Sequence, residues 1–137
     1  DIFSIRIAGN FANQDILGSM EFACNVAGSK LVVVLGHTKC GALKGGLDAP
    51  QIEGLGMDNL NHLIYHFESC IHEIIKEGEE RSSKNDDLLD RLTLCNIQKT
   101  IEDIRHQSST LRNLEKEGKI KIVGANYDVE TGVVTWL

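Results

Sequence analysis

Apolar and polar positions in the first third of the chain predict two strands with a helix between them. Residues 2–7 alternate loosely and are rich in isoleucine, which predicts a strand. Residues 15–27 have apolar side chains at helical spacing, Asp15 as a possible N-cap, and Gly28 just beyond them. Residues 30–35 are mostly valine and leucine, apolar on both faces, as in a buried parallel strand. This order predicts a right-handed strand–helix–strand unit.

The middle of the chain predicts a loop and then a long helix. Residues 47–56 hold the only proline and predict a loop. From Met57 to Ile75, apolar residues recur at helical spacing and predict one helix. Residues 77–86 are polar and predict a solvated linker.

The last third predicts two helices and a pair of strands. A long helix carries one apolar face, made of Leu94, Ile97, Ile101 and Ile104. A short helix capped by Ser109 follows and stops at Gly118. Residues 120–127 predict a strand, 128–132 a turn, and 133–137 an antiparallel return.

These elements predict the α/β class. We expect one domain over residues 1–137, with a mostly parallel sheet flanked by helices and an antiparallel strand at its C-terminal edge. Ligands of such sheets bind beyond the carboxyl ends of the strands. Residues that follow the strand at 30–35 are therefore the first candidates for a site.

Net charge and the spacing of the cysteines narrow the range of binding partners and cellular compartments. The net charge is −6 with no cluster of lysine or arginine, which argues against nucleic acid or an anionic membrane as a partner. No apolar run approaches the length of a membrane span, and the N-terminus is not a signal peptide. It lacks a methionine and predicts a strand already under way, so we expect a piece of a longer protein. The four cysteines are widely spaced, which favours free thiols and a cytoplasmic setting.

The stretch LGHTKCGALKGG, residues 35–46, carries the candidate chemistry. His37 and Cys40 are a plausible zinc pair, since imidazole and thiolate both suit Zn²⁺. Spacing alone favours the alternative, a tight turn with a buried cysteine, because a zinc site needs three or four protein ligands. A phosphate loop is disfavoured, since the Gly-Lys-Ser/Thr ending is missing. His62 and His66 are one helical turn apart but lie off the apolar stripe, which favours a solvated face.

Together with its flanks, this stretch resembles the β-class carbonic anhydrases, and the resemblance covers nearly the whole chain. The matching blocks are Arg6-Ile7-Ala8-Gly9-Asn10, Gly18-Ser19-Met20-Glu21-Phe22, Leu31 to Ala42 with Gly36-His37-Thr38-Lys39-Cys40-Gly41, and Val123 to Val133. The resemblance implies reversible hydration of CO₂ to bicarbonate by zinc-bound hydroxide. It also implies a homodimer or homotetramer.

The resemblance further implies roles for particular residues. His37 and Cys40 match two of the three protein ligands of the catalytic zinc. The third family ligand belongs to an upstream Cys-x-Asp-x-Arg motif that also supplies a catalytic Asp–Arg dyad, and this motif is absent from the 137 residues. Ala8, Gly9 and Asn10 match the loop near the substrate pocket.

Arg6 and Tyr127 match positions that hold a regulatory bicarbonate in some family members. For Arg6 a structural ion pair, for example with Glu21, is the favoured alternative. Two alternative functions stay open: a catalytically silent scaffold, and a related zinc hydrolase of another small linear molecule such as CS₂.

The family's first, central strand is also missing from this chain. It lies between the strand that matches residues 2–7 and the one that matches residues 30–35. Each backbone group left buried and unpaired costs about 1–3 kcal/mol, and several such losses exceed a typical net stability of about 5–15 kcal/mol. We therefore expect that these residues alone do not form the family fold as a stable monomer.

Overall fold

The computed structural model describes residues 1–52 and 54–137, which form seven helices and three strands. The helices are α1 (Gln14–Asn25), α2 (Gly41–Leu47), α3 (Ala49–Ile52), α4 (Asp58–Tyr65), α5 (Glu68–Ile74), α6 (Asp86–Gln107) and α7 (Ser109–Lys116). The strands are β1 (Leu31–His37), β2 (Lys121–Tyr127) and β3 (Val134–Trp136). No helix among the described residues is long and apolar enough to cross a membrane.

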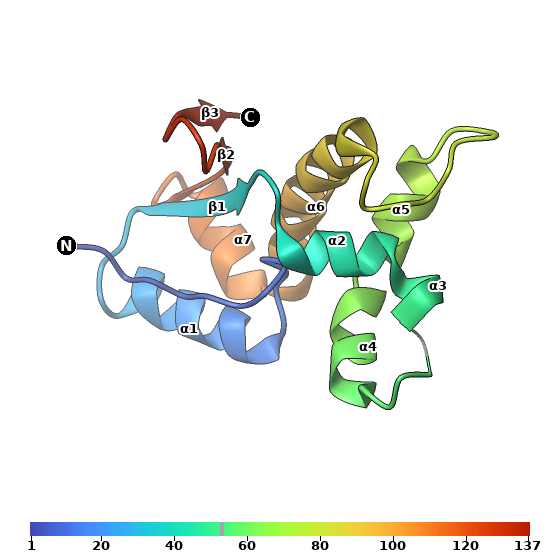
Figure 1. Ribbon diagram of the computed structural model, residues 1–137. Helices are drawn as coiled ribbons and strands as arrows, with labels where there is room; N and C mark the ends of the chain where they lie inside the picture. The colour runs from blue at the N-terminus through green and yellow to red at the C-terminus, as the bar shows by residue number, and fades with distance from the viewer. Residues whose placement is uncertain (53) are drawn as a thin grey trace.

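The sheet has the order β1-β2-β3 (Figure 1). β1 and β2 are parallel, in a register that runs from Leu31 opposite Lys121 to His37 opposite Tyr127. β3 returns antiparallel to β2, with Trp136 opposite Ala125. The predicted α/β class, the parallel pair and the antiparallel C-terminal strand are confirmed.

The strand predicted at residues 2–7 is wrong. This segment has no regular structure and runs between β1 and α1 in the view of Figure 1. A strand needs a hydrogen-bonded neighbour, and among the described residues neither this segment nor the outer edge of β1 has one. This agrees with the expectation that the family's central strand belongs between them.

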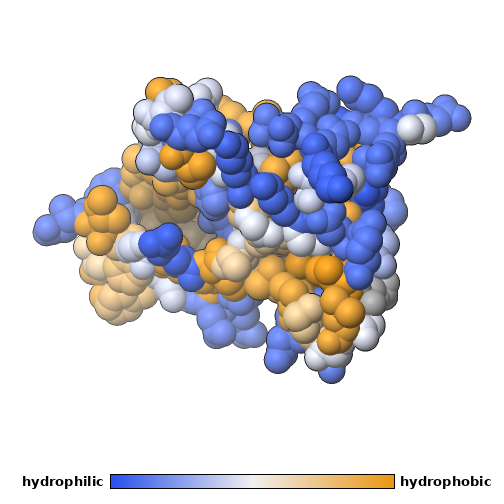
Figure 2. Space-filling view, viewed as in Figure 1, coloured by the Kyte–Doolittle hydropathy of each residue, from blue (hydrophilic) through white to orange (hydrophobic). Residues whose placement is uncertain are grey.

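One face of the sheet is covered by helices and the other is open. Val34 and Ile122 pack into a core with residues of α1, α6 and α7. On the opposite face of β1, Leu31, Val33 and Leu35 are 51%, 38% and 46% exposed. Figure 2 shows apolar side chains around β1 on the side facing the viewer. The expectation that β1 is buried on both faces is therefore wrong, because the described helices cover only one face.

A second core joins α2, α4, α5 and α6, and it contains a disulfide between Cys70 and Cys95. Their Cα atoms are 5.9 Å apart. The expectation of free thiols is wrong for this pair, whose separation of 25 residues gives no local signal. Cys24 and Cys40 are free and buried, as expected. The predicted cytoplasmic location loses part of its support, because disulfides are rare in reducing compartments.

The helix predicted from Met57 to Ile75 is broken into α4 and α5. At the junction, the amides of His66 and Phe67 bond to carbonyls three residues back, at 3.3 and 3.1 Å, which tightens the chain and turns it. Apolar spacing continues through this break, so periodicity does not reveal it. The predicted loop at 47–56 also contains a helix, α3, and the helix caps are Asn13 and Ser108 where Asp15 and Ser109 were expected.

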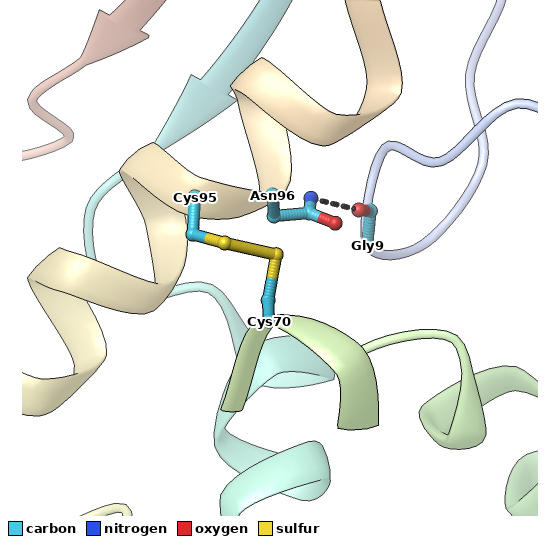
Figure 3. The surroundings of a disulfide bond; sticks show 4 residues. All are labelled: Gly9, Cys70, Cys95 and Asn96. Carbon is cyan, nitrogen blue, oxygen red and sulfur yellow. Dashed lines mark hydrogen bonds between the residues drawn. A yellow bond between two sulfur atoms is a disulfide. The ribbon is translucent and has the colours of Figure 1, made fainter. Parts of the chain in front are cut away.

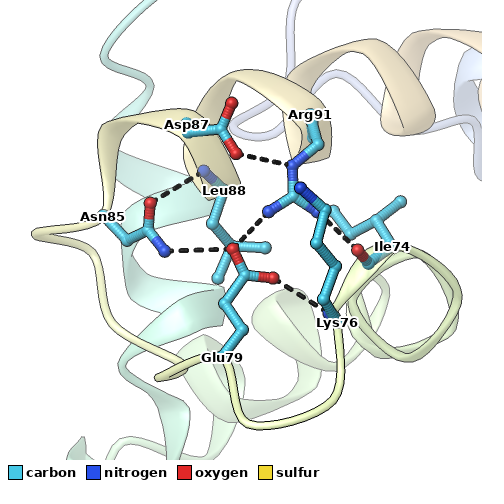
Figure 4. Close-up of polar contacts among 7 residues, drawn as sticks. All are labelled: Ile74, Lys76, Glu79, Asn85, Asp87, Leu88 and Arg91. Atoms are coloured by element: carbon cyan, nitrogen blue, oxygen red, sulfur yellow. Dashed lines mark hydrogen bonds and ion pairs between the residues drawn. The ribbon is translucent and has the colours of Figure 1, made fainter.

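The segment between α5 and α6 is not simply solvated, as the sequence predicts, but is held by a polar network (Figure 4). Glu79 accepts hydrogen bonds from the amide of Lys76 at 2.9 Å and the side chain of Asn85 at 3.2 Å. These bonds and Arg91 lower the pKa of Glu79. Arg91 also donates to the carbonyl of Ile74 at the end of α5. The linker therefore fastens α5 to α6.

Candidate active site

The turn that carries His37 and Cys40 lies at the carboxyl end of β1. His37 is the last residue of the strand and is exposed, while Cys40 is buried and precedes α2 as its N-cap. Lys39, between them, has a φ of 58°, which turns the chain sharply. The apolar valine run ends at a glycine, so strand and turn both follow from local sequence.

The imidazole of His37 has a defined partner. Its Nδ1 lies 2.8 Å from the carbonyl oxygen of Thr38, which can only accept, so Nδ1 carries the proton. This leaves Nε2 with a free lone pair, the usual state of a histidine that binds a metal. The sequence alone does not identify this acceptor.

The turn is fastened to the β2–β3 hairpin. The amide of Thr38 donates to Tyr127 O at 2.9 Å, and the amide of Val129 donates to Thr38 Oγ1 at 3.1 Å. Lys39 pairs with Glu130, whose carboxylate raises the pKa of the lysine. Three contacts from one hairpin therefore hold the short segment between His37 and Cys40.

The loop of Ala8, Gly9 and Asn10 is held by α6. Gly9 and Asn10 have positive φ values of 80° and 53°. Asn96 Nδ2 donates to Gly9 O at 2.7 Å, and Thr100 Oγ1 donates to Asn10 O at 3.0 Å. The sequence prediction missed Asn96 and Thr100. Their signal is a pair of polar residues, four apart, on the buried face of the helix.

Arg6 and Tyr127 occupy different parts of the candidate site. Tyr127 pairs with His37 across the β1–β2 ladder and is 37% exposed. Arg6 is exposed, and among the described residues no ion pair joins it to Glu21, which accepts a hydrogen bond from Ser108 at 2.6 Å. The ion pair of Arg6 with Glu21, given as the example, is therefore not formed, and a structural ion pair of Arg6 with another residue stays a prediction. No hydrogen bond joins Arg6 to Tyr127 in residues 1–52 and 54–137 either.

The other histidines lie apart from this turn in chain position and in packing. His66 stacks on Phe11 with ring centroids 3.9 Å apart, and His62 meets His66 edge-on at 5.4 Å. Burial lowers the pKa of His66, with a smaller effect of His62. Both residues are exposed, in agreement with the predicted solvated face.

The donors present suit zinc by their chemistry, but they are an incomplete set. One imidazole and one thiol from a single turn are typical zinc ligands. Across the part of the chain that the structure describes, no group of three or more His, Cys, Asp or Glu could hold a metal ion. Asn10 Nδ2 and Asn126 Oδ1 are buried without a hydrogen-bond partner there. As donors, His37 and Cys40 therefore fit part of a zinc site, and the described residues bring no third ligand to them.

A parallel strand pair with a His-x-x-Cys turn at the carboxyl end of its first strand, and an antiparallel strand beside the second, is the arrangement expected of the β-carbonic anhydrases. The carbonic anhydrase family model matches residues 1–134, so the chain belongs to this family. Carbonic anhydrase 2 of Mycobacterium tuberculosis is 27% identical over 132 residues, which cover 96% of this chain and 60% of the relative. A carbonic anhydrase of Synechococcus elongatus is 30% identical, over 98% of this chain and 50% of its own length.

Solved structures agree with this assignment. The β-carbonic anhydrase CafA of Aspergillus fumigatus is 26% identical with a TM-score of 0.84, over 100% of this chain and 64% of that one. The β-carbonic anhydrase CcaA, 23% identical, shares the fold with a TM-score of 0.84, over 99% and 67%. A tetrameric β-carbonic anhydrase of Sordaria macrospora, 18% identical, shares it with a TM-score of 0.73, over 95% and 64%. The chain thus spans about half to two thirds of these relatives.

Proposed function

We propose that the protein containing this chain catalyses the reversible hydration of CO₂ to bicarbonate and a proton, with zinc as its cofactor. The observation that carries this proposal is the turn after β1, where His37 and Cys40 stand at the carboxyl end of a parallel strand. Ligands of parallel α/β sheets bind at this end. Membership of the carbonic anhydrase family supports the reaction.

In this proposal, His37 Nε2 and Cys40 Sγ hold the zinc. Zinc, when bound, supplies a Lewis acid that lowers the pKa of water to about 7. The bond to Thr38 O keeps the imidazole in one tautomer, and the hairpin keeps the turn in place. A catalytic zinc has three protein ligands, so in this proposal a further ligand comes from beyond the residues that the structure describes. The family resemblance assigns it to a cysteine that precedes an Asp–Arg dyad.

The loop of Ala8, Gly9 and Asn10 borders the substrate pocket in this proposal. The buried Asn10 Nδ2, unpaired among the described residues, offers a donor for an oxygen of bicarbonate or for a segment beyond them. Arg6 and Tyr127 are proposed as a regulatory bicarbonate site, since the guanidinium forms no ion pair with Glu21.

We further propose a homodimer or homotetramer in the cytoplasm. The exposed apolar side chains of β1 favour burial in an assembly, since large apolar patches mark interfaces. A solved relative with the same fold is described as tetrameric. The cytoplasmic location stays a prediction from the wide spacing of the four cysteines in the sequence.

The test uses stopped-flow CO₂ hydration and zinc analysis on the full-length protein. His37→Ala and Cys40→Ser should lose zinc and lower kcat/KM by more than about 100-fold, since even residues that only orient a ligand change affinity or activity by 10–100-fold. Matched controls are His72→Ala, an exposed histidine, and Cys24→Ser, a free buried thiol. Both should keep zinc and activity.

Two outcomes would contradict the proposal in different ways. Zinc retained at full stoichiometry in both ligand variants would refute the assignment of His37 and Cys40. A zinc-loaded full-length protein without CO₂ hydration would favour a silent scaffold, and hydrolysis of CS₂ by that protein would favour the related zinc hydrolase.

A further inference from the structure

The Gly9–Asn10 loop depends on side chains of other elements for its shape. Both residues have positive φ, which is uncommon for a residue with a side chain such as Asn10. Their carbonyl oxygens accept hydrogen bonds from Asn96 and Thr100, which are 7% and 5% exposed. Two buried donors on α6 therefore fix the backbone of this loop.

The start of α5 holds the same loop from another side. The Phe67 ring, fully buried, lies so close that a Cβ on Gly9 would stand 2.2 Å from Phe67 Cζ. The same ring lies against Gly46 of α2, where a Cβ would stand 2.9 Å from Phe67 Cδ2. Phe67 thus packs between the loop and the helix that begins after Cys40.

The Cys70–Cys95 disulfide joins the two elements that hold the loop. Cys70 lies in the first turn of α5, three residues after Phe67, so both side chains share one side of the helix. Cys95 directly precedes Asn96 in α6. Figure 3 shows the disulfide beside Asn96, whose amide points to the carbonyl of Gly9. Cys40, Phe67 and Cys70 belong to the same buried cluster.

We propose that the Cys70–Cys95 disulfide is a redox-sensitive clamp that positions the Gly9–Asn10 loop through Asn96 and Phe67. The inference rests on the proposed function, in which this loop borders the substrate pocket. With the disulfide formed, α5 and α6 are linked, and Phe67 and Asn96 together hold the loop in one position. With two thiols, Phe67 and Asn96 move independently and the loop loosens, so catalysis slows while the fold remains.

Cys95 is the partly exposed half of the bond, whereas Cys70 is 2% exposed, and the reduction itself is chemically simple. Cys95 lines an open groove of about 390 Å³ together with Glu73, Arg91 and Gln98. Reduction breaks the S–S bond, and each sulfur gains an electron and a proton. A trialkylphosphine supplies the electron pair and becomes a phosphine oxide, with its oxygen and the two protons coming from water.

Other contacts keep the two helices together after reduction. Arg91 of α6 still bonds to the carbonyl of Ile74 at the far end of α5, and to Glu79 in the segment between the two helices (Figure 4). The disulfide holds the first turn of α5, and the arginine holds its last turn. We therefore expect a local change at the loop without separation of the helices.

The test compares the full-length, zinc-loaded protein before and after treatment with a trialkylphosphine. Hydrogen exchange of the amides at residues 9–11 should become about tenfold faster on reduction, since local opening sets exchange rates. The value of kcat/KM should fall about tenfold, since small misplacements reduce rates by up to about 100-fold. Zinc content should stay the same.

Variants separate the clamp from general destabilisation. Cys70→Ser/Cys95→Ser should show both changes without phosphine and no further response to it. Asn96→Asp keeps the size of the side chain but turns the donor into an acceptor, so the loop should exchange faster although the disulfide is intact. Cys24→Ser, which removes a free buried thiol, should respond to phosphine as the parent protein does.

Three outcomes would overturn the proposal: equal loop exchange in both redox states, a phosphine response that survives in the double-serine variant, or free Cys70 and Cys95 thiols in the air-oxidised protein. The exchange measurement does not depend on activity. If the loop loosens on reduction but neither state hydrates CO₂, the clamp stands and the proposed function fails.

Discussion

Replacing Gly36 by alanine should destabilise the protein, because β1 and α6 touch at this residue. A Cβ on Gly36 would stand 2.6 Å from Ile97 Cδ1 and 2.8 Å from Ile97 Cγ1. Gly36 pairs with Asn126 in the sheet, which restricts the strand. Ile97 is fully buried and also fills the space next to Gly124, where a Cβ would stand 2.8 Å from its Cγ2. The isoleucine therefore has little room to turn away.

The size of the effect follows from the missing space. Carbon atoms pack best at about 3.5–4.0 Å, so the new methyl group is about 1 Å too close to two atoms. Overpacking of this kind costs about 1–3 kcal/mol, and two clashes against a restricted side chain place Gly36→Ala in the upper half of that range. With an m-value of about 2 kcal/mol/M, the urea midpoint should fall by about 1 M.

The assay is urea unfolding of the full-length protein at fixed protein and zinc concentrations, since both change apparent stability. Gly18→Ala is the matched control, because nothing lies within 4 Å of the position of its Cβ and the residue is in α1. Gly18→Ala should raise the free energy of unfolding by up to about 1 kcal/mol. Introduced into the Ile97→Ala variant, Gly36→Ala should lower the free energy of unfolding by at least about 1 kcal/mol less than it does in the parent protein. A midpoint equal to that of the parent protein, or strict additivity of the pair, would refute the clash.

Two further predictions concern the chain by itself and its stability towards acid. The isolated 137-residue chain should not melt cooperatively as a monomer, since residues 2–7 and one edge of β1 lack strand partners among the described residues. Thermal melting followed by circular dichroism, with a measurement of the molecular mass in solution, tests this. A cooperative melt of a monomer would contradict it. Glu115 accepts two hydrogen bonds of 2.8 Å from Arg105, which lower the pKa of its carboxyl below the unfolded value. Its stabilisation is complete above the usual carboxyl pKa of about 4.3 and is lost as the pH falls through the lowered pKa. The melting temperature of Glu115→Gln should therefore lie below that of the parent protein at pH 7 and approach it below about pH 4; a pH-independent difference would exclude this role.

The features that local sequence encodes could be predicted. The valine run of β1 and the Asp128–Gly132 turn act over a few residues, and both appear where expected. Asp128 Oδ1 accepts from the amides of Glu130 and Thr131, and these bonds lower its pKa. The position of His37 and Cys40 at the carboxyl end of the strand follows from the same local signals.

Features that depend on packing between distant segments could not be predicted. The Cys70–Cys95 bond needs α5 to lie against α6, and the break before α5 leaves the apolar spacing unchanged. Residues 2–7 have the composition of a strand, but their structure depends on a neighbour that the described residues do not supply. The role of Asn96 and Thr100 could not be predicted, because it depends on the Gly9–Asn10 loop, about 90 residues away in the chain, packing against α6.

The fastening of the His37–Cys40 turn bears on how gene variants of this protein should be assessed. Both proposed ligands precede residue 41 of this chain, but the contacts that hold their turn come from Tyr127, Val129 and Glu130. A premature stop codon after Ala125 would leave every proposed ligand of this chain in the product. It would remove the β2–β3 hairpin that fastens the His37–Cys40 turn. An assessment that looks only at the proposed ligand residues would therefore classify a protein with an unsupported turn as intact.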